Sequence, residues 1–64
     1  MFKTATAATI AVGTRVWIGY RRYVVTEKIV NDLNVIIYTA PASNPTSRVK
    51  LRHEMTFTDK FNLV

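Results

Sequence analysis

Polar and apolar residues alternate along the C-terminal third of the chain. Most odd-numbered positions from 49 to 63 are apolar, and the even-numbered positions from 48 to 62 are polar. A period of two is typical of an extended strand with one face on a core and the other in water. The pattern predicts β-structure here, with His53 and Asp59 as the polar residues on the apolar parity.

Three basic residues share the polar parity of this segment, namely Arg48, Lys50 and Arg52. On one continuous strand they would form a basic stripe facing water. Such a stripe would neutralise nucleic-acid phosphates. Alternatively, it would be an ordinary water-exposed face whose charges discourage edge-to-edge aggregation. The sequence leaves both interpretations open.

The alternating segment is longer than an ordinary strand, so we expect it to break. The break is expected near His53 and Glu54, or at residues 58–60. The second position suits a single 3₁₀ turn, with Thr58 or Asp59 as its cap. A short last strand over residues 61–64 would follow.

Gly19 and Tyr20 mark a hairpin. Glycine at the first central position suits a two-residue type II′ turn, between a strand over residues 15–18 and a strand over residues 21–30. Along this second strand Glu27 has the parity of the inner face, and we expect it at the rim of the core. A further strand is predicted over the apolar run 35–39, covered on both faces and central in the sheet.

The hairpin register predicts the surroundings of Trp17. It pairs Trp17 with Arg22 on the outer face, and Val16 with Tyr23 on the inner face. An indole beside a guanidinium on an exposed face gives a cation–π contact of about 0.5–1 kcal/mol. A turn longer by one residue would bury the indole, and a half-buried or core position is favoured for the single tryptophan.

The N-terminal segment has no clear periodicity. Alanine favours helix, whereas threonine and isoleucine favour strand, so residues 1–11 are expected to form an irregular lead-in or a short strand. Thr4, Thr6 and Thr9 interrupt its apolar character, which argues against a signal peptide. No stretch approaches the roughly 20 apolar residues that span a bilayer. Residues 12–64 are expected to form one small domain.

Composition narrows the function classes. Nine Lys and Arg against four Asp and Glu give a net charge of +5 on 64 residues, which favours encounter with nucleic acid or an acidic protein surface. The same charge would also serve solubility alone. The chain has no cysteine and one histidine, so we expect no disulfide and no metal site. The lack of cysteine is compatible with a cytoplasmic location, the host cytoplasm for a phage-encoded protein.

The stretch Val12-Gly13-Thr14-Arg15-Val16 and the order of elements after it resemble an SH3-like small barrel. Similar modules are common among bacteriophage and bacterial proteins. The resemblance covers about residues 12–64 and implies an all-β, five-stranded antiparallel barrel. It implies no function, because the chain lacks the acidic loop residues of peptide-binding SH3 domains and the additional glycines of KOW-type barrels.

We therefore expect a non-enzymatic binding module without a cofactor. His53 and Glu54 are sequence neighbours on opposite strand faces, so they cannot act as an acid–base pair. Nucleic acid is the first predicted partner, and docking on an acidic protein surface or self-assembly are the alternatives. The predicted contact residues are Arg15, Trp17, Tyr20, Arg21, Arg22, Arg48, Lys50 and Arg52.

Overall fold

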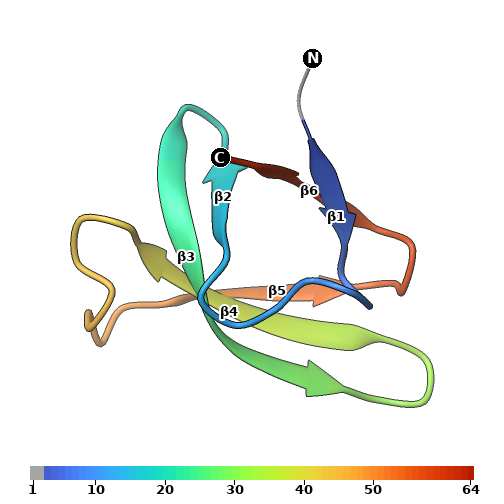
Figure 1. The fold of residues 1–64 in the computed structure, drawn as a ribbon. Coiled ribbons are helices and arrows are strands. Elements are labelled where there is room, and N and C mark those ends of the chain that lie inside the picture. Colours follow the sequence, from blue (N-terminus) through green and yellow to red (C-terminus); the bar gives the residue numbers. More distant parts are fainter. Residues whose placement is uncertain (1–2) are drawn as a thin grey trace.

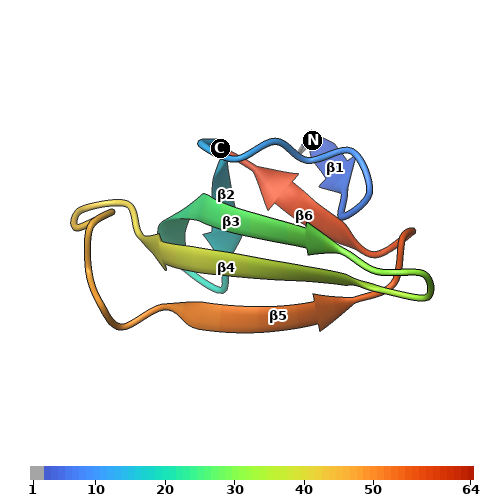
Figure 2. The same cartoon turned by 90° about the horizontal axis from the view of Figure 1, so that it is seen from below.

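The structure is a computed structural model that describes residues 3–64, and it is all-β in this range. Its strands are β1 (Thr4–Thr6), β2 (Arg15–Ile18), β3 (Arg21–Val30), β4 (Val35–Pro41), β5 (Leu51–Met55) and β6 (Lys60–Leu63). They form one antiparallel sheet in the order β1-β6-β2-β3-β4-β5, which curls around a single core (Figures 1 and 2). The all-β antiparallel prediction is confirmed.

The predicted closed five-stranded barrel is wrong, because the sheet is open and has a sixth strand. A strand has only two edges along which it can pair. In β6 one edge pairs with β2 and the other pairs with β1, so no edge is left for β5. The two sides of the curl meet through side chains instead, where the rings of His53 and Phe61 pack edge to face at 5.4 Å.

The predicted β2–β3 hairpin is confirmed in its register. Trp17 lies opposite Arg22, and Val16 lies opposite Tyr23. Gly19 has a φ of +61° and Tyr20 does not have a positive φ, as a type II′ turn requires. The turn therefore fixes which side chains of the hairpin face outward.

A β-bulge in β3 overturns the expectation for Glu27. The register with β4 shifts between Val25 and Glu27, so one extra residue separates them. As a result Glu27 lies opposite Tyr38 on the outer face and is exposed, whereas Lys28 lies opposite buried Ile37 on the inner face. Parity counted along the sequence fails here because the bulge reverses it.

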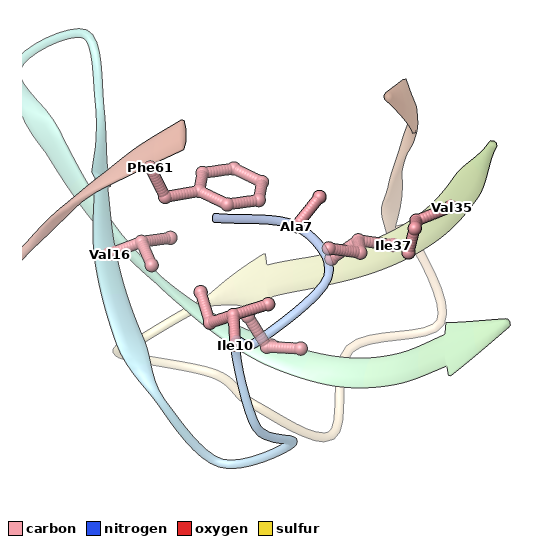
Figure 3. Close-up of a cluster of buried hydrophobic side chains, with 7 residues drawn as sticks. Ala7, Ile10, Val16, Val35, Ile37 and Phe61 are labelled. Carbon is pink, nitrogen blue, oxygen red and sulfur yellow. The ribbon is translucent and has the colours of Figure 1, made fainter. Parts of the chain in front are cut away.

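The core is a small aliphatic cluster closed by one aromatic ring (Figure 3). Its buried members are Ala7, Ile10, Val16, Val25, Val35, Ile37 and Phe61. Two of them come from the N-terminal lead-in, which crosses the open side of the curled sheet after β1 (Figure 1). The short-strand alternative for the lead-in thus holds for residues 4–6, and the first two residues lie outside the described range.

Lys28 ties the lead-in to the sheet. Its Nζ donates hydrogen bonds to the carbonyl oxygens of Ala8 at 2.8 Å and Ile10 at 3.0 Å. Ala7 N also donates to Asp59 O at 2.7 Å, which joins the lead-in to the turn before β6. The bulge turns Lys28 toward the inner face, and this orientation lets its ammonium group bind the lead-in.

Lys28→Met is expected to lower the free energy of unfolding by about 1–2 kcal/mol, because two carbonyl groups lose a charged donor. Lys60→Met is the matched control, since Lys60 is exposed on β6 and forms no side-chain hydrogen bond within residues 3–64. Urea unfolding followed by circular dichroism measures both. An equal loss of unfolding free energy in the two variants would show that the hydrogen bonds from Lys28 to the lead-in do not stabilise the fold.

The C-terminal alternation breaks at residues 56–59, close to the second predicted position. Asp59 N donates to Thr56 O at 3.2 Å, and Thr56 N donates to the Asp59 carboxylate at 2.9 Å. Asp59 therefore caps this turn as predicted, although the turn is a β-turn and no 3₁₀ helix forms. After it, Phe61 enters the core.

Candidate nucleic-acid interface

A hollow of about 590 Å³ lies at the end of the sheet where the β2–β3 hairpin meets the loop after β4. It is lined by Arg15, Trp17, Tyr20, Arg21, Arg22, Tyr23, Pro41, Ala42 and Ser43. We call it the hairpin hollow. Five of the eight predicted contact residues line it, because the hairpin register and its tight turn bring them to one end of the sheet.

Trp17 is half-buried on the outer face, as the predicted register requires. The Arg22 guanidinium carbon lies 5.9 Å from the centre of the indole ring, so the predicted cation–π contact is confirmed. On its other side Trp17 lies opposite Asn62 of β6. A second, smaller hollow of about 340 Å³ is lined there by Trp17, Gly19, Tyr20 and Asn62, so the indole borders two hollows.

The hairpin hollow is strongly basic. Arg15, Arg21 and Arg22 contribute three cations, and no acidic residue is among the described residues that line it. None of the three forms an ion pair within residues 3–64, where Arg52–Glu54 is the one salt bridge. Three cations without nearby carboxylates produce a local positive field that attracts an anion.

Tyr20 is the most exposed aromatic residue of the hairpin hollow. Tyr20 occupies the second central position of the turn, and its side chain is 100% exposed. An exposed phenol beside an indole and guanidinium groups offers flat faces on which bases or planar cations stack. Aromatic stacking and phosphate neutralisation are thus both available at one end of the sheet.

The predicted basic stripe on one strand is wrong in its extent. β5 begins at Leu51, because β4 pairs with it only as far as Thr39. Arg48 and Lys50 are exposed in the loop before β5, where the Ser47 hydroxyl accepts a hydrogen bond from the backbone N of residue 49. This side-chain hydrogen bond shapes a local loop in place of an extended ladder.

Arg52 is the member of the stripe that lies on a strand. It lies opposite Tyr38, and Tyr38 lies opposite Glu27, so all three share the outer face. Its NH1 lies 3.5 Å from Glu54 Oε2. Arg15 is on the same outer face, but β3 and β4 lie between its strand and β5. Arg52 is therefore outside the hairpin hollow, and its charge is partly offset.

The loop side of the hairpin hollow was not predicted. Pro41, Ala42 and Ser43 line it together with Tyr23, because Tyr23 lies opposite Pro41 and Ala42 N donates to Arg22 O at 3.1 Å. The proline-rich composition predicts only a surface loop. Its position against the hairpin depends on the β3–β4 register, which the bulge shifts.

His53 is half-buried on the inner face, the side that its parity predicts. Its Nε2 shares a hydrogen bond of 2.9 Å with the hydroxyl of buried Thr39. Burial lowers the pKa of His53 from its usual 6.5, because desolvation disfavours the imidazolium. The side chain is therefore half-buried on the inner face of the edge strand β5.

The lowered pKa of His53 predicts a pH dependence of folding. The unfolded chain binds a proton near pH 6.5 and the folded chain only at lower pH, so stability is constant above this range and falls below it. Urea unfolding between pH 8 and 5 measures this decline. His53→Gln keeps a hydrogen-bonding side chain and should remove that part of the decline; an unchanged pH profile would show that other groups cause it.

Within residues 3–64, no three His, Asp or Glu side chains gather in a way that would hold a metal ion. In the same range no helix is present that would cross a bilayer. The sequence matches no family model and no curated protein, and the fold matches no solved structure. The fold and the hairpin hollow define a small all-β domain with an aromatic and basic surface.

Proposed function

We propose that the protein is a non-enzymatic module that binds nucleic acid through the hairpin hollow. The observation that carries the proposal is that Arg15, Arg21 and Arg22 line the same hollow as Trp17 and Tyr20, without an acidic residue among the described lining residues. The guanidinium groups would bind phosphates, and the rings would stack on bases. Stacking requires unpaired bases, so single strands are the expected ligand.

Oligonucleotide binding at two salt concentrations tests the proposal. If three phosphates are neutralised, affinity for a single strand falls about 20-fold between 50 and 200 mM salt. Fluorescence anisotropy with a labelled 12-nucleotide strand and the corresponding duplex measures this change. The absence of salt-dependent binding to either ligand at micromolar protein would refute the proposal.

A pair of triple variants separates the hairpin hollow from net charge alone. The first replaces Arg15, Arg21 and Arg22 by glutamine, and the second replaces Arg48, Lys50 and Arg52 by glutamine. Both remove three positive charges. We expect the first to abolish most of the salt dependence and the second to weaken binding by less than about threefold, because screening limits distant charges. Equal losses would show that net charge alone binds the strand.

Docking on an acidic protein surface is the alternative outcome. The exposed Tyr20 and the free arginine side chains have the composition of an interface hot spot. A pull-down from bacterial lysate with and without nuclease distinguishes the two. A partner lost after nuclease treatment supports nucleic-acid binding. A protein partner that is still captured by the triple variant of Arg15, Arg21 and Arg22 would show that the hairpin hollow is not the binding surface.

A further inference from the structure

We propose that the free edge of β5 joins two copies of this chain edge to edge, as an antiparallel dimer centred on His53. β5 is the last strand of the sheet, paired with β4 on one side only. Its backbone therefore presents unpaired N–H and C=O groups along the other side. This inference is independent of the proposed nucleic-acid binding.

The apolar residues around β5 are exposed beyond what the alternation predicts. Leu51 faces the inner side of the sheet, opposite Thr39, yet it is 40% exposed. Val49 before the strand is 78% exposed, and Phe57 after it is 36% exposed. Nothing else in residues 3–64 covers this edge, and a second β5 would cover it.

The sequence of β5 is self-complementary in one antiparallel register. With His53 on the two-fold axis, Arg52 lies opposite the partner's Glu54, and Leu51 lies opposite the partner's Met55. Opposite charges then face each other on the outer side, and apolar side chains face each other on the inner side. Cross-strand pairs of both kinds stabilise a sheet by about 0.2–1 kcal/mol each.

Among the residues of β5 itself, other registers lack this complementarity. A shift by two residues places Arg52 opposite the partner's Arg52, or Glu54 opposite the partner's Glu54. In-register parallel pairing also sets like charges against each other, which is unfavourable. A shift by one residue would pair the inner face with the outer face. The charges thus select the register centred on His53 over its neighbours.

The groups that the dimer requires are accessible. Arg52 and Glu54 are 50% and 58% exposed in their side chains, and their mutual contact of 3.5 Å is an exposed ion pair. Such a pair is worth only about 0–1 kcal/mol, so it does not prevent either group from facing a partner. Glu54 Oε1 also accepts a hydrogen bond from Asn34 Nδ2 at 3.1 Å, and this contact is exposed as well.

The other edge of the sheet is a weaker candidate. β1 has three residues, Thr4–Thr6, and offers neither charge pairs nor large apolar side chains. The five residues of β5 would themselves bury less than the roughly 1,200–2,000 Å² of a stable interface. We therefore expect a dimer that forms reversibly with rising concentration.

Charge reversal tests the register. Arg52→Glu alone and Glu54→Arg alone each place like charges across the axis, and both are expected to weaken dimerisation at least tenfold. The double variant carrying both changes restores opposite charges across the axis and conserves net charge, so it should regain the dimer. Sedimentation equilibrium from 5 to 500 µM measures the dissociation constants, and circular dichroism checks that each variant is folded.

A cysteine on the axis provides a second test. Directly opposed residues of an antiparallel pair have Cα atoms about 4.5–5.5 Å apart, within the range that a disulfide spans. Because the chain has no cysteine, His53→Cys introduces the single thiol. It should oxidise to a covalent dimer much faster than Thr58→Cys, which places the thiol on an exposed turn.

Two results would overturn the proposal. A monomer throughout the concentration range, with equal oxidation rates of the two cysteine variants, would show that β5 remains a free edge. A dimer that the charge reversals leave unchanged would place the interface elsewhere. Recovery by the double variant, together with rapid oxidation at position 53, would establish both the surface and its register.

Discussion

Trp17→Ala is expected to weaken binding of a single-stranded oligonucleotide by about 5- to 150-fold, the effect of losing one stacked base, about 1–3 kcal/mol. The indole borders both hollows at the hairpin end, and Arg22 contacts its ring. Removing the ring therefore removes the stacking surface and leaves the three arginine residues of the hairpin hollow in place. The salt dependence of the remaining binding should be nearly unchanged.

Two comparisons make this prediction specific. Trp17→Phe keeps a flat ring and should retain most of the affinity for the single strand. The affinity for a duplex should change little in either variant, because the bases of a duplex are already stacked on one another. Anisotropy titrations provide the affinities, and thermal unfolding monitors folding, since Trp17 is half-buried. Equal losses for single strand and duplex would contradict a stacking role.

Ile37→Ala is expected to destabilise the fold by about 2–5 kcal/mol, because it removes a fully buried side chain and leaves a cavity. A chain of this size has a total stability of only roughly 3–10 kcal/mol. The variant should therefore be partly or wholly unfolded at 25 °C. Ile37 lies on β4 between His53 of β5 and Lys28 of β3, so its loss also loosens the contacts that hold the lead-in.

Ile29→Ala is the matched control for the core. Ile29 lies opposite Ile36 on the outer face and is 40% exposed, so the same truncation should cost only about 1 kcal/mol, within the range of β-propensity. Urea unfolding with fluorescence from Trp17 compares the two variants. Similar costs would contradict the assignment of inner and outer faces across the bulge.

The hairpin shows how far local chemistry predicts this fold. Glycine followed by tyrosine specifies a two-residue turn, and that turn alone fixes the pairing of Trp17 with Arg22 and the outward face of both. The turn before β6 is similar, because the carboxylate of Asp59 satisfies a backbone donor three residues earlier. Both predictions depend on contacts between residues close in sequence.

Apart from the type of the turn before β6, the errors concern distant contacts. The β3 bulge reverses the parity that assigned Glu27 to the inner face. Pairing of β1 with β6 removes the edge that barrel closure needs, and no periodicity in residues 1–11 predicts it. The basic stripe is reduced to Arg52 because the β4–β5 ladder ends at the pair of Thr39 and Leu51, and Arg48 and Lys50 lie in the loop before β5.

The sequence by itself determined an all-β chain, its tight hairpin, its excess of positive charge and the side of the strand on which His53 lies. These follow from side-chain period, turn chemistry and composition, which act within a few residues. The tertiary structure alone decided that the sheet stays open, that Lys28 holds the lead-in, and that the loop after β4 lines the same hollow as the hairpin arginine residues. Strand order and register decide these features, because they join residues that are far apart along the chain.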